Sequence, residues 1–409
     1  MNVVQINAVY HSSSTGRLTE ELHNFLLDKG VNSYVFCTNI KGAKDNIYKI
    51  GNKLDYMLHA SLSHLLGKQA YFSFISTFFM IKKLDRIQPD VIILGNLHGN
   101  FINLPLLLKY IANKNIPTIL ILHDCWFFTG HCCYYTDDNC YKWKVQCDKC
   151  PILHKYNKSL FLDNSKSIFD HKKQLFSQLK HLTVVGVSDW IKNEAMQSPI
   201  LHNASNFLRI YNWIDLDLFK PLYSDTIRTD LSIGLDTFLI LGVSQYWSEY
   251  KGLNRFIRLA KDNESYKIIL VGEMPANVEL PSNILSVGAV NSAEILAKYY
   301  NAADVFVNFS IQETFGLVSA EAIACGTPLI TNSYTANPEI CGRSCGYIVD
   351  LDHWNKVIDA IEDVRIKGKK YFLNSCRNFA VNNFSKSNSL ESYSNTIKYC
   401  VSSQKMAMD

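Results

Sequence analysis

Residues 303–331 read ADVFVNFSIQETFGLVSAEAIACGTPLIT, and the order of residue types here indicates the kind of sheet that the chain builds. A run of β-branched and aromatic residues at 305–309 is followed by a short polar loop and a helical segment at 317–324. Cys325 and Gly326 stop that helix, and a second apolar run begins at Pro328. Strand, loop, helix, glycine stop and strand in this order form half of a βαβ unit, which predicts a parallel sheet.

Two carboxylates, Glu313 and Glu321, flank the turn between that strand and that helix. Glu313 stands at the carboxyl end of the expected strand, where parallel α/β sheets place their ligands. The first amides of the helix combine free N–H groups with the positive end of the helix dipole, which makes an anion site. A simpler interpretation is that Glu321 is solvated and that Glu313 only favours the dipole. The amides belong to Phe315, Gly316, Leu317 and Val318.

The composition is that of an ordinary globular protein. The chain has 409 residues, 47% hydrophobic and 19% charged, which suits two folded domains and argues against disorder. The net charge of +4 is too small, and too little clustered, for a nucleic-acid-binding protein. We therefore expect no nucleic-acid partner.

The expected location is the cytoplasm. The first ten residues lead directly into a strand without the basic segment of a signal peptide, and the longest apolar tracts are too short to span a membrane. Twelve cysteines without an export signal favour a reducing compartment. Residues 54–84 form a helical tract rich in aromatic and basic residues, which fits either core packing or peripheral contact with a membrane surface.

Three polar loops follow expected strands in the first half of the chain. A Ser-rich loop after residues 3–7 contains Gly16 and Arg17, and Gly16 is either part of a phosphate-binding loop or a turn glycine. The other two loops lie at strand ends that share one edge if the sheet is parallel, and their histidines either line a crevice or cap the strands. Their candidate residues are His98, Asn100, His123 and Asp124.

A cysteine-rich insertion occupies residues 126–151. Cys147 and Cys150 have the spacing of a zinc knuckle, and Cys140 with Cys132 completes four thiolates. Cys133 and His131 are alternative ligands, and free thiols or an oxidised pair are alternative states. Because four thiolates leave no open position on the metal, we expect a structural zinc ion rather than a catalytic one.

Strand and helix alternate in both halves, so we expect an α/β protein of two facing doubly wound, Rossmann-like domains. The polar run at 221–236 looks like a linker. We expect an N-terminal, acceptor-binding domain at 1–215, a C-terminal, nucleotide-sugar-binding domain at 216–384, and a helix at 385–409 that returns to the first domain.

The markers resemble those of glycosyltransferase family 4, in register along almost the whole chain. Within that family, segments 96–99, 123–126 and 129–132 are similar to bacterial enzymes that build surface polysaccharides of the O-antigen and colanic acid types. The resemblance implies the GT-B-type fold. The markers are 14–17, His123-Asp124, Val187-Ser188, Asn212 with Asp215, Lys251-Gly252, 270–272 and the Glu313–Glu321 pair.

By this resemblance the chain is a retaining glycosyltransferase with a nucleotide diphosphate sugar as donor and a lipid-linked saccharide as acceptor. Lys251 would neutralise the diphosphate together with the amides at 315–318, while Glu313 would hold the transferred sugar and Glu321 the ribose. His123 would contact the sugar, and no cofactor is required for the chemistry.

We assign the remaining candidates by site: Gly16 and Arg17 to the donor, and His98, Asn100 and Asp124 to the acceptor. The family usually has an arginine about six residues before the lysine, where this chain has Gln245. A catalytically silent, zinc-stabilised subunit that binds nucleotide sugar and a sugar-nucleotide epimerase on the same fold are the alternatives.

Overall fold

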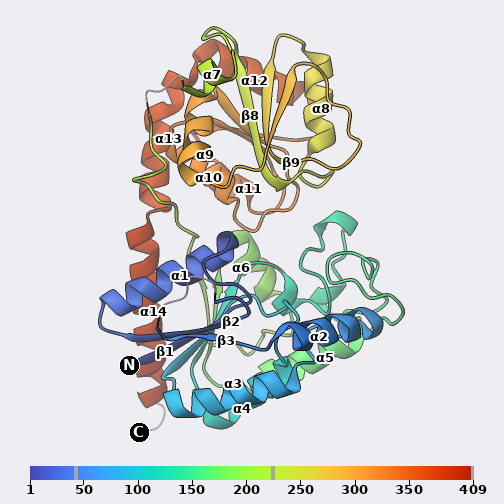
Figure 1. The fold of residues 1–409 in the computed structure, drawn as a ribbon, viewed down its shortest axis with the longest axis vertical. Coiled ribbons are helices and arrows are strands. Elements are labelled where there is room, and N and C mark those ends of the chain that lie inside the picture. The colour runs from blue at the N-terminus through green and yellow to red at the C-terminus, as the bar shows by residue number, and fades with distance from the viewer. Residues whose placement is uncertain (41–44, 223–225, 407–409) are drawn as a thin grey trace. The chain divides into compact units, whose positions relative to one another are not determined.

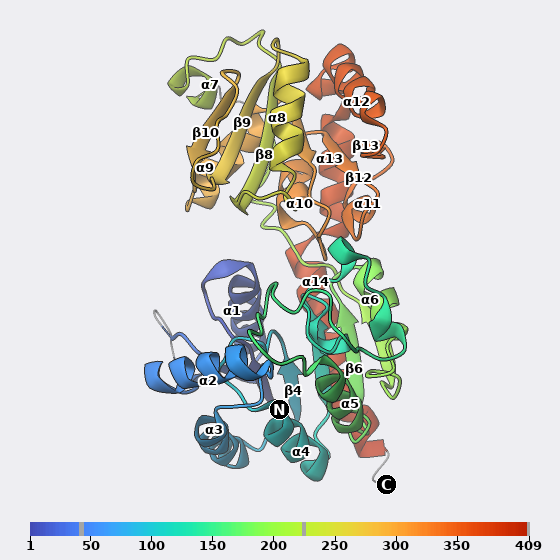
Figure 2. The ribbon, with the colours of Figure 1, turned by 90° about the vertical axis from the view of Figure 1, so that its right-hand side faces the viewer.

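The computed structural model describes residues 1–40, 45–222 and 226–406, and the chain divides into two compact units (Figure 1). Unit 1 consists of Met1–Ile210 and Leu390–Asp409, and unit 2 of Tyr211–Ser389. Each unit is built around its own parallel sheet, with helices on both faces (Figures 1 and 2).

Unit 1 contains a seven-stranded sheet in the order β3-β2-β1-β4-β5-β6-β7, in which every strand pairs parallel to its neighbours. The order reverses between β1 and β4, so the sheet is doubly wound. Its strands are β1 (Asn2–Ile6), β2 (Asn32–Cys37), β3 (Ile47–Lys49), β4 (Val91–Leu94), β5 (Thr118–Leu122), β6 (Leu182–Gly186) and β7 (Asn206–Arg209).

The helices of unit 1 are α1 (Ser13–Asp28), α2 (Lys53–Leu66), α3 (Phe74–Ile87), α4 (Leu104–Lys114), α5 (Ser165–Phe176) and α6 (Asp189–Met196). Three short 3-10 helices, Trp126–Phe128, Thr136–Asp138 and Lys142–Lys144, lie in the long connection between β5 and α5. From Leu390 onward, α14 (Lys386–Met406) also belongs to unit 1, where Gln404 Nε2 donates to the Asn115 carbonyl at 2.5 Å.

Unit 2 repeats the architecture with a six-stranded parallel sheet in the order β10-β9-β8-β11-β12-β13. Its order reverses between β8 and β11. The strands are β8 (Leu239–Tyr246), β9 (Lys267–Glu273), β10 (Ile284–Gly288), β11 (Val305–Asn308), β12 (Leu329–Asn332) and β13 (Gly346–Val349). The helices are α7 (Thr226–Asp230), α8 (Leu253–Asp262), α9 (Ala293–Ala302), α10 (Leu317–Ala324), α11 (Asn337–Ile340), α12 (Trp354–Lys367) and α13 (Lys369–Asn383).

The central strands are apolar runs because parallel sheets are covered by helices on both faces. All four residues of β4 and all five of β5 are buried, as are all four of β11 and of β12. The expected α/β class with two doubly wound sheets is therefore confirmed, as is the C-terminal helix that packs in the first unit.

The tract at 54–84 is interrupted at Gly67, as the sequence predicts, because Gly67 adopts a left-handed conformation (φ 62°) and ends α2. Two other local expectations are wrong. The loop after β1 is shorter than expected, since α1 begins at Ser13. The run at 221–236 is no linker over its described residues: α7 lies in unit 2, where the buried Arg228 donates to the Gly234 carbonyl and pairs with Asp304 at 2.8 Å. Residues 223–225 lie outside the described part.

Candidate functional site

The loops that follow β8 and β11 meet at the point where the strand order of unit 2 reverses. Doubly wound sheets bind ligands in the crevice that forms there. The Ile311 N–H donates to the Tyr250 carbonyl at 3.1 Å, which ties the two loops together. Gly252 has a φ of +80°, and a Cβ added to it would lie 2.3 Å from the Phe309 Cβ. Glycine is therefore required where the loops cross.

This crossing brings Lys251 to Glu313. The Lys251 Nζ lies 2.6 Å from the Glu313 Oε1, in an ion pair whose side chains are 35% and 16% exposed. The backbone of Glu313 is fixed on both sides, since its N–H donates to the Thr335 Oγ1 at 3.0 Å and its carbonyl accepts the Ala336 N–H at 3.1 Å. The sequence thus placed this lysine and this carboxylate in one site correctly, although their roles remain predictions.

The start of α10 lies immediately after this pair. Gly316 precedes the helix with a φ of 96°, so the chain turns sharply into Leu317 and Val318. Phe315 is 2% exposed, and its ring packs against those of Tyr211 (5.7 Å between centroids) and Phe384 (5.4 Å). The aromatic packing holds the first turn of α10, and with it the positive end of the helix dipole, beside Lys251 and Glu313.

Glu321 is buried rather than solvated, so the simpler interpretation of this residue is wrong. It is 5% exposed, and its Oε2 accepts a hydrogen bond from the hydroxyl of the fully buried Tyr300 at 3.0 Å. A carboxylate that is buried and hydrogen-bonded has a defined direction. Tyr300 was not singled out from the sequence, because a tyrosine near the end of α9 belongs to no motif.

Gly16 lies at the start of α1, and its place in a phosphate-binding loop stays a prediction. It lies in the first turn of α1 and not at a positive φ, so the turn-glycine interpretation is wrong. A Cβ there would lie 3.2 Å from the Tyr10 carbonyl carbon, and the His11 N–H donates to the Gly16 carbonyl at 3.1 Å. Glycine lets the loop fold closely over the helix start, with the half-buried Arg17 next in the chain.

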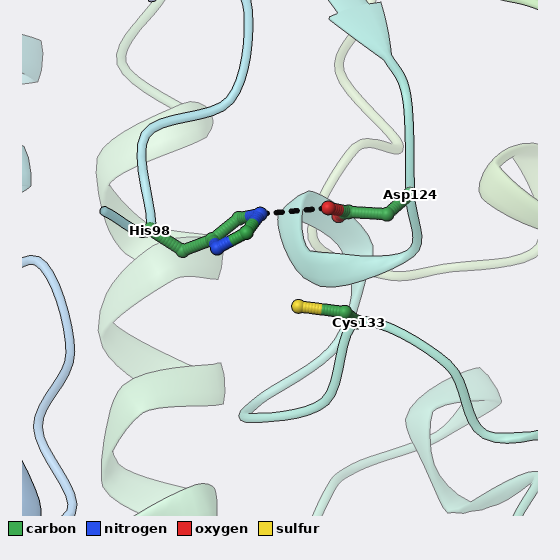
Figure 3. A group of neighbouring side chains, drawn as sticks. All are labelled: His98, Asp124 and Cys133. Carbon is green, nitrogen blue, oxygen red and sulfur yellow. Dashed lines mark hydrogen bonds and ion pairs between the residues drawn. The ribbon is translucent and has the colours of Figure 1, made fainter. Parts of the chain in front are cut away.

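Unit 1 carries a second polar group, made by His98, Asp124 and Cys133 (Figure 3). The His98 Nε2 lies 2.7 Å from the Asp124 Oδ2, and the Asp124 Oδ1 accepts the Trp126 N–H at 2.9 Å. Burial alone would lower the pKa of His98, but Cys133 and the Asp124 carboxylate raise it well above its usual value. The imidazole is therefore held as a cation beside a carboxylate.

The three side chains offer one nitrogen, one oxygen and one sulfur within 4.8 Å of one another, which is a set of metal-ligand types. However, two ligands about 2.1 Å from a tetrahedral metal ion lie about 3.4 Å apart. The 2.7 Å between His98 and Asp124 is a charge-assisted hydrogen-bond distance instead. As arranged, the pair shares a proton rather than a metal ion.

Two further candidates of unit 1, His123 and Asn100, are not part of the hydrogen bond between His98 and Asp124. His123 follows β5, and burial lowers the pKa of its imidazole to about 4 although Asp124 opposes the shift, so His123 is neutral at pH 7. Asn100 lines a cavity of about 250 Å³ with Lys49 and Lys53, and its buried Oδ1 has no hydrogen-bond partner in the described structure. The structure thus joins His98 to Asp124 but places Asn100 in a separate hollow.

The cysteine-rich insertion separates its two adjacent cysteines. Cys132 lines a small cavity together with Cys140, Cys147 and Cys150, whereas Cys133 lies at His98 and Asp124. None of the twelve cysteines forms a disulfide in the described structure. Nothing in the spacing of the sequence distinguished Cys132 from Cys133; their opposite directions come from the path of the loop.

Two doubly wound parallel sheets, one with a lysine, a carboxylate and a helix start at its switch point, define a GT-B-type α/β protein. Residues 237–365, which lie in unit 2, match the family described as glycosyl transferases group 1. Both Lys251 and Glu313 lie within the matched residues.

Solved structures show the same fold over almost the whole chain. Sucrose-phosphate synthase from Thermosynechococcus elongatus superposes with a TM-score of 0.69 at 15% identity, covering 98% of this chain and 99% of that one. Anabaena HepE in complex with UDP-glucose gives a TM-score of 0.65 at 15% identity, covering 98% and 100%. WaaG, a glycosyltransferase involved in lipopolysaccharide biosynthesis, gives 0.61 at 15% identity, covering 97% and 99%.

Relatives by sequence cover less. An uncharacterized 41.2 kDa protein in the cps region of Klebsiella pneumoniae is 28% identical over 190 residues, which are 45% of this chain and 52% of that protein. The D-inositol 3-phosphate glycosyltransferase of Mycobacteroides abscessus is 26% identical over 192 residues, 43% of each chain. This chain spans about half the length of the curated relatives that it matches.

Proposed function

We propose that this protein is a retaining glycosyltransferase that moves a sugar from a nucleotide diphosphate sugar to a saccharide acceptor in bacterial surface polysaccharide biosynthesis. The observation that carries the proposal is the contact of Lys251 with Glu313 at the switch point of unit 2, within the residues that match glycosyl transferases group 1. Similarity to the cps-region protein and to the fold of WaaG supports the pathway class.

Lys251 is assigned to the leaving group. When the glycosidic bond to the diphosphate breaks, negative charge grows on the phosphate oxygens, and a fixed cation lowers the energy of that state. The ammonium group is 35% exposed and held by Glu313, so it can meet an incoming diphosphate without first being ordered. The N–H groups that open α10 add positive potential from the same side.

Glu313 and Glu321 are assigned to the donor sugar and the ribose. A carboxylate accepts hydrogen bonds from hydroxyl groups, so each oxygen of Glu313 can hold one sugar hydroxyl once the diphosphate takes Lys251. The Glu321 Oε2 already accepts a hydrogen bond from the Tyr300 hydroxyl, and the second oxygen is assigned to the ribose. No metal ion is needed, because the lysine and the helix start supply the positive charge.

The acceptor is assigned to unit 1. His98 and Asp124 form a charged pair that can order a saccharide hydroxyl, and the neutral His123 can accept a proton from one. Asn100 would contact a more distant part of the acceptor from its own cavity. These assignments rest on the position of the residues at the carboxyl ends of β4 and β5.

We further propose that the acceptor is lipid-linked and that unit 1 rests on the cytoplasmic face of a membrane. No helix in the described part of the chain is long and apolar enough to cross a bilayer. Helix α2 nevertheless buries two polar residues, His59 and Ser63, and exposes apolar ones. The exposed apolar surface comprises Leu54, Tyr56, Met57, Leu58 and Leu65 of α2, Phe74, Ile75, Phe78 and Phe79 of α3, and Leu160, Phe161 and Leu162.

Two features of this surface favour contact with a membrane. The Leu160 N–H donates to the His64 carbonyl at 2.7 Å, so the loop continues the surface of α2, and large contiguous apolar patches mark interaction sites. Lys68, Lys82 and Arg86 lie on or next to the same helices, where they can meet anionic headgroups. Free thiols throughout the described chain agree with the cytoplasmic side.

The donor assignment is tested by substituting the ion pair. Lys251→Gln and Glu313→Gln should each lower the kcat/KM for release of nucleoside diphosphate by about 100- to 1,000-fold, as loss of one transition-state charge contact does in other enzymes. The measurement screens UDP-, GDP-, ADP- and dTDP-sugars with the unmodified protein first, and then applies the variants to the sugar that is turned over.

Lys261→Gln provides the matched control, because Lys261 is an exposed lysine on the neighbouring α8. If the Lys251 and Glu313 variants keep the activity of this control, the donor site lies elsewhere.

Gln245 favours a second candidate, a silent subunit that binds nucleotide sugar without transferring it. Gln245 is exposed at the end of β8, where the family resemblance implies an arginine, so the site has one cation fewer. Calorimetric binding of a nucleotide sugar with no turnover in the screen would support that candidate. Release of an epimer instead of nucleoside diphosphate would support the epimerase.

A further inference from the structure

The cysteine-rich connection between β5 and α5 contains a cavity that the proposed transfer reaction does not use. The cavity has a volume of about 10 Å³, enough for one water-sized body, and is lined by Cys132, Cys140, Cys147 and Cys150. The four thiols come from separate parts of a connection whose regular structure is limited to short 3-10 helices. Long connections with so little regular structure are uncommon in compact domains, so further interactions are expected to stabilise this one.

We propose that this cavity binds one zinc ion through the thiolates of Cys132, Cys140, Cys147 and Cys150. Four sulfur ligands suit zinc and leave no position for water, so the ion is structural. No three of these thiols, all within the described part of the chain, lie within 4.8 Å of one another. Zinc holds two sulfur ligands about 3.8 Å apart, so binding draws the thiols inward.

A histidine on the same cavity points to a missing partner independently of the thiols. His131 is 3% exposed, and its Nε2 has no hydrogen-bond partner in the described structure, although buried polar atoms are nearly always paired. The ring is engaged by the Leu153 backbone, which leaves Nε2 as the unpartnered nitrogen at the cavity. A zinc ion with its thiolates would supply the polar partner that this atom lacks.

The surroundings of the thiols match those of a zinc knuckle. The Gly130 N–H donates to the Cys147 Sγ at 3.2 Å, and a Cβ on Gly130 would lie 2.8 Å from the Cys147 Cβ, so glycine is required for this approach. The Lys142 Nζ donates to the carbonyls of Asp148 and Lys149, at 2.9 and 3.0 Å, and so closes the turn between Cys147 and Cys150. Hydrogen bonds of this kind orient and support metal ligands.

A zinc ion at this place would act on the polar group of unit 1 through the chain. Cys132 faces the cavity, and the next residue, Cys133, contacts His98 and Asp124. The Cys133 carbonyl also accepts the Cys125 N–H at 2.8 Å, which joins the insertion to the end of β5. The ion would therefore be a positioning element for His98 and Asp124.

An alternative holds the insertion without metal. The rings of Phe128, Tyr135 and Trp143 pack 5.0 Å apart in consecutive pairs around Trp143 and form a small apolar core of their own. In that case the thiols are simply free, or two of them oxidise to a disulfide. Both alternatives predict a protein without stoichiometric zinc.

The test measures metal by mass spectrometry in the full-length protein, purified under reducing conditions without chelator. The expected result is close to one zinc per chain. Cobalt substituted for zinc should give the thiolate-to-metal charge-transfer band of a four-sulfur site. Far less than one equivalent of zinc, with all twelve thiols free to react after unfolding, overturns the proposal. So does a thiol count lower by two, which indicates a disulfide.

The variants use two adjacent cysteines as a matched pair. Cys132→Ser should lower the zinc content at least tenfold, whereas Cys133→Ser should retain it, although the two residues are 6% and 7% exposed. Equal zinc loss in both variants overturns the ligand assignment. Retention of zinc in His131→Ala is expected, and its loss there together with retention in Cys132→Ser would replace the four-sulfur set. Glycosyl transfer is not the readout, so failure here leaves the proposed function untouched.

Discussion

Gly252 is the residue on which the approach of Lys251 to Glu313 depends. Its φ of +80° lies in the left-handed region, where a residue with a Cβ is strained by roughly 1–2 kcal/mol. Its neighbour Phe309 leaves no room for a Cβ, because the two carbons would stand 2.3 Å apart. The positive φ and the lack of space for a Cβ are separate requirements for glycine. Gly288 of the same unit meets only the first.

Gly252→Ala should therefore destabilise unit 2 more than Gly288→Ala. Gly288 also has a positive φ (+71°), but nothing lies within 4 Å of where its Cβ would be. We expect about 1–2 kcal/mol for Gly288→Ala and at least about 1–3 kcal/mol more for Gly252→Ala, from overpacking against Phe309. Urea unfolding of the two variants measures the difference in the free energy of unfolding. Equal decreases in both variants would show that the loops carrying Gly252 and Phe309 can separate without loss of stability.

The sequence identified the motif residues of the candidate site in unit 2 and missed those that support them. Lys251 and Glu313 were brought together correctly, because strand ends at a switch point converge. Thr335, which accepts the Glu313 N–H, and Tyr300, which contacts Glu321, were missed. Their importance depends on which loop or helix lies opposite, and that information is tertiary.

Among the helices, α2 has the most unusual distribution of residues. Its buried side consists of His59 and Ser63, and the imidazole of His59 contacts the Ser73 hydroxyl at 2.8 Å while its Nε2 has no partner in the described structure. The Ser73 hydroxyl in turn donates to the Asp55 carboxylate at 2.8 Å. Because burial outweighs every other influence, the pKa of His59 is lowered to about 4.

Acid should consequently destabilise unit 1 through His59. The unfolded chain protonates this side chain below about pH 6.5, but the folded protein does so only near pH 4, so stability is complete above 6.5 and is lost as the pH falls towards 4. Between pH 7 and pH 5 the loss from this group should be about 2 kcal/mol. The urea unfolding of unit 1 measured at both pH values gives the quantity.

His59→Gln keeps a polar group beside Ser73 but does not titrate. The pH dependence of this variant should be smaller than that of the unmodified protein by about one bound proton over the same range. Parallel curves for the two proteins would mean that His59 is protonated in the folded state.

The bounds of helices were predicted well where glycine marks a helix end, and poorly where no residue type marks the start or end. Helix α10 has the bounds expected from its glycines, Leu317–Ala324. The start of α1 was missed, because His11 and Ser13 adopt positive φ values of 64° and 61°. Neither residue type predicts such a conformation. The division of 54–84 into α2 and α3 follows from Gly67. The glycine alone, however, does not predict that α3 begins only at Phe74.

At the scale of the whole molecule, the proposed membrane contact is assigned to the apolar surface of α2, α3 and residues 160–162. Replacing Ile75 and Phe79, exposed by 72% and 62%, with serine should lower binding to vesicles of anionic phospholipid at least tenfold, since each large apolar side chain contributes roughly 1.5–3 kcal/mol when buried. Co-sedimentation measures the binding, at low and at high salt.

The control removes one isoleucine and one aromatic residue from unit 2. Ile366 and Tyr371 are 82% and 66% exposed on α12 and α13. The double serine variant at these positions should bind vesicles like the unmodified protein. An equal decrease in both variants would indicate unspecific adsorption.

The division into two sheets was predictable because strand–helix alternation has a strong local signature, and the buried strands of a parallel sheet are continuous apolar runs. The path of the insertion could not be predicted, because the conformation of a loop depends on its tertiary contacts and has no periodic sequence pattern. Arg228 shows the same limit: in a polar run it looked like part of a linker, but it is buried among carbonyl groups and Asp304.

Unit 1 is discontinuous in the chain, and this has a consequence for synthesis. Its sheet is made from residues up to 210, but α14, which carries Cys400 within 3.4 Å of the Thr183 hydroxyl on β6, is translated only after all of unit 2. At 5–20 residues per second the ribosome needs roughly 10–40 seconds to make the residues between. During this interval unit 2 can fold completely while unit 1 still shows the apolar side that α14 will cover. The part that begins first is therefore finished last, and nascent chains stalled within unit 2 should depend on chaperones.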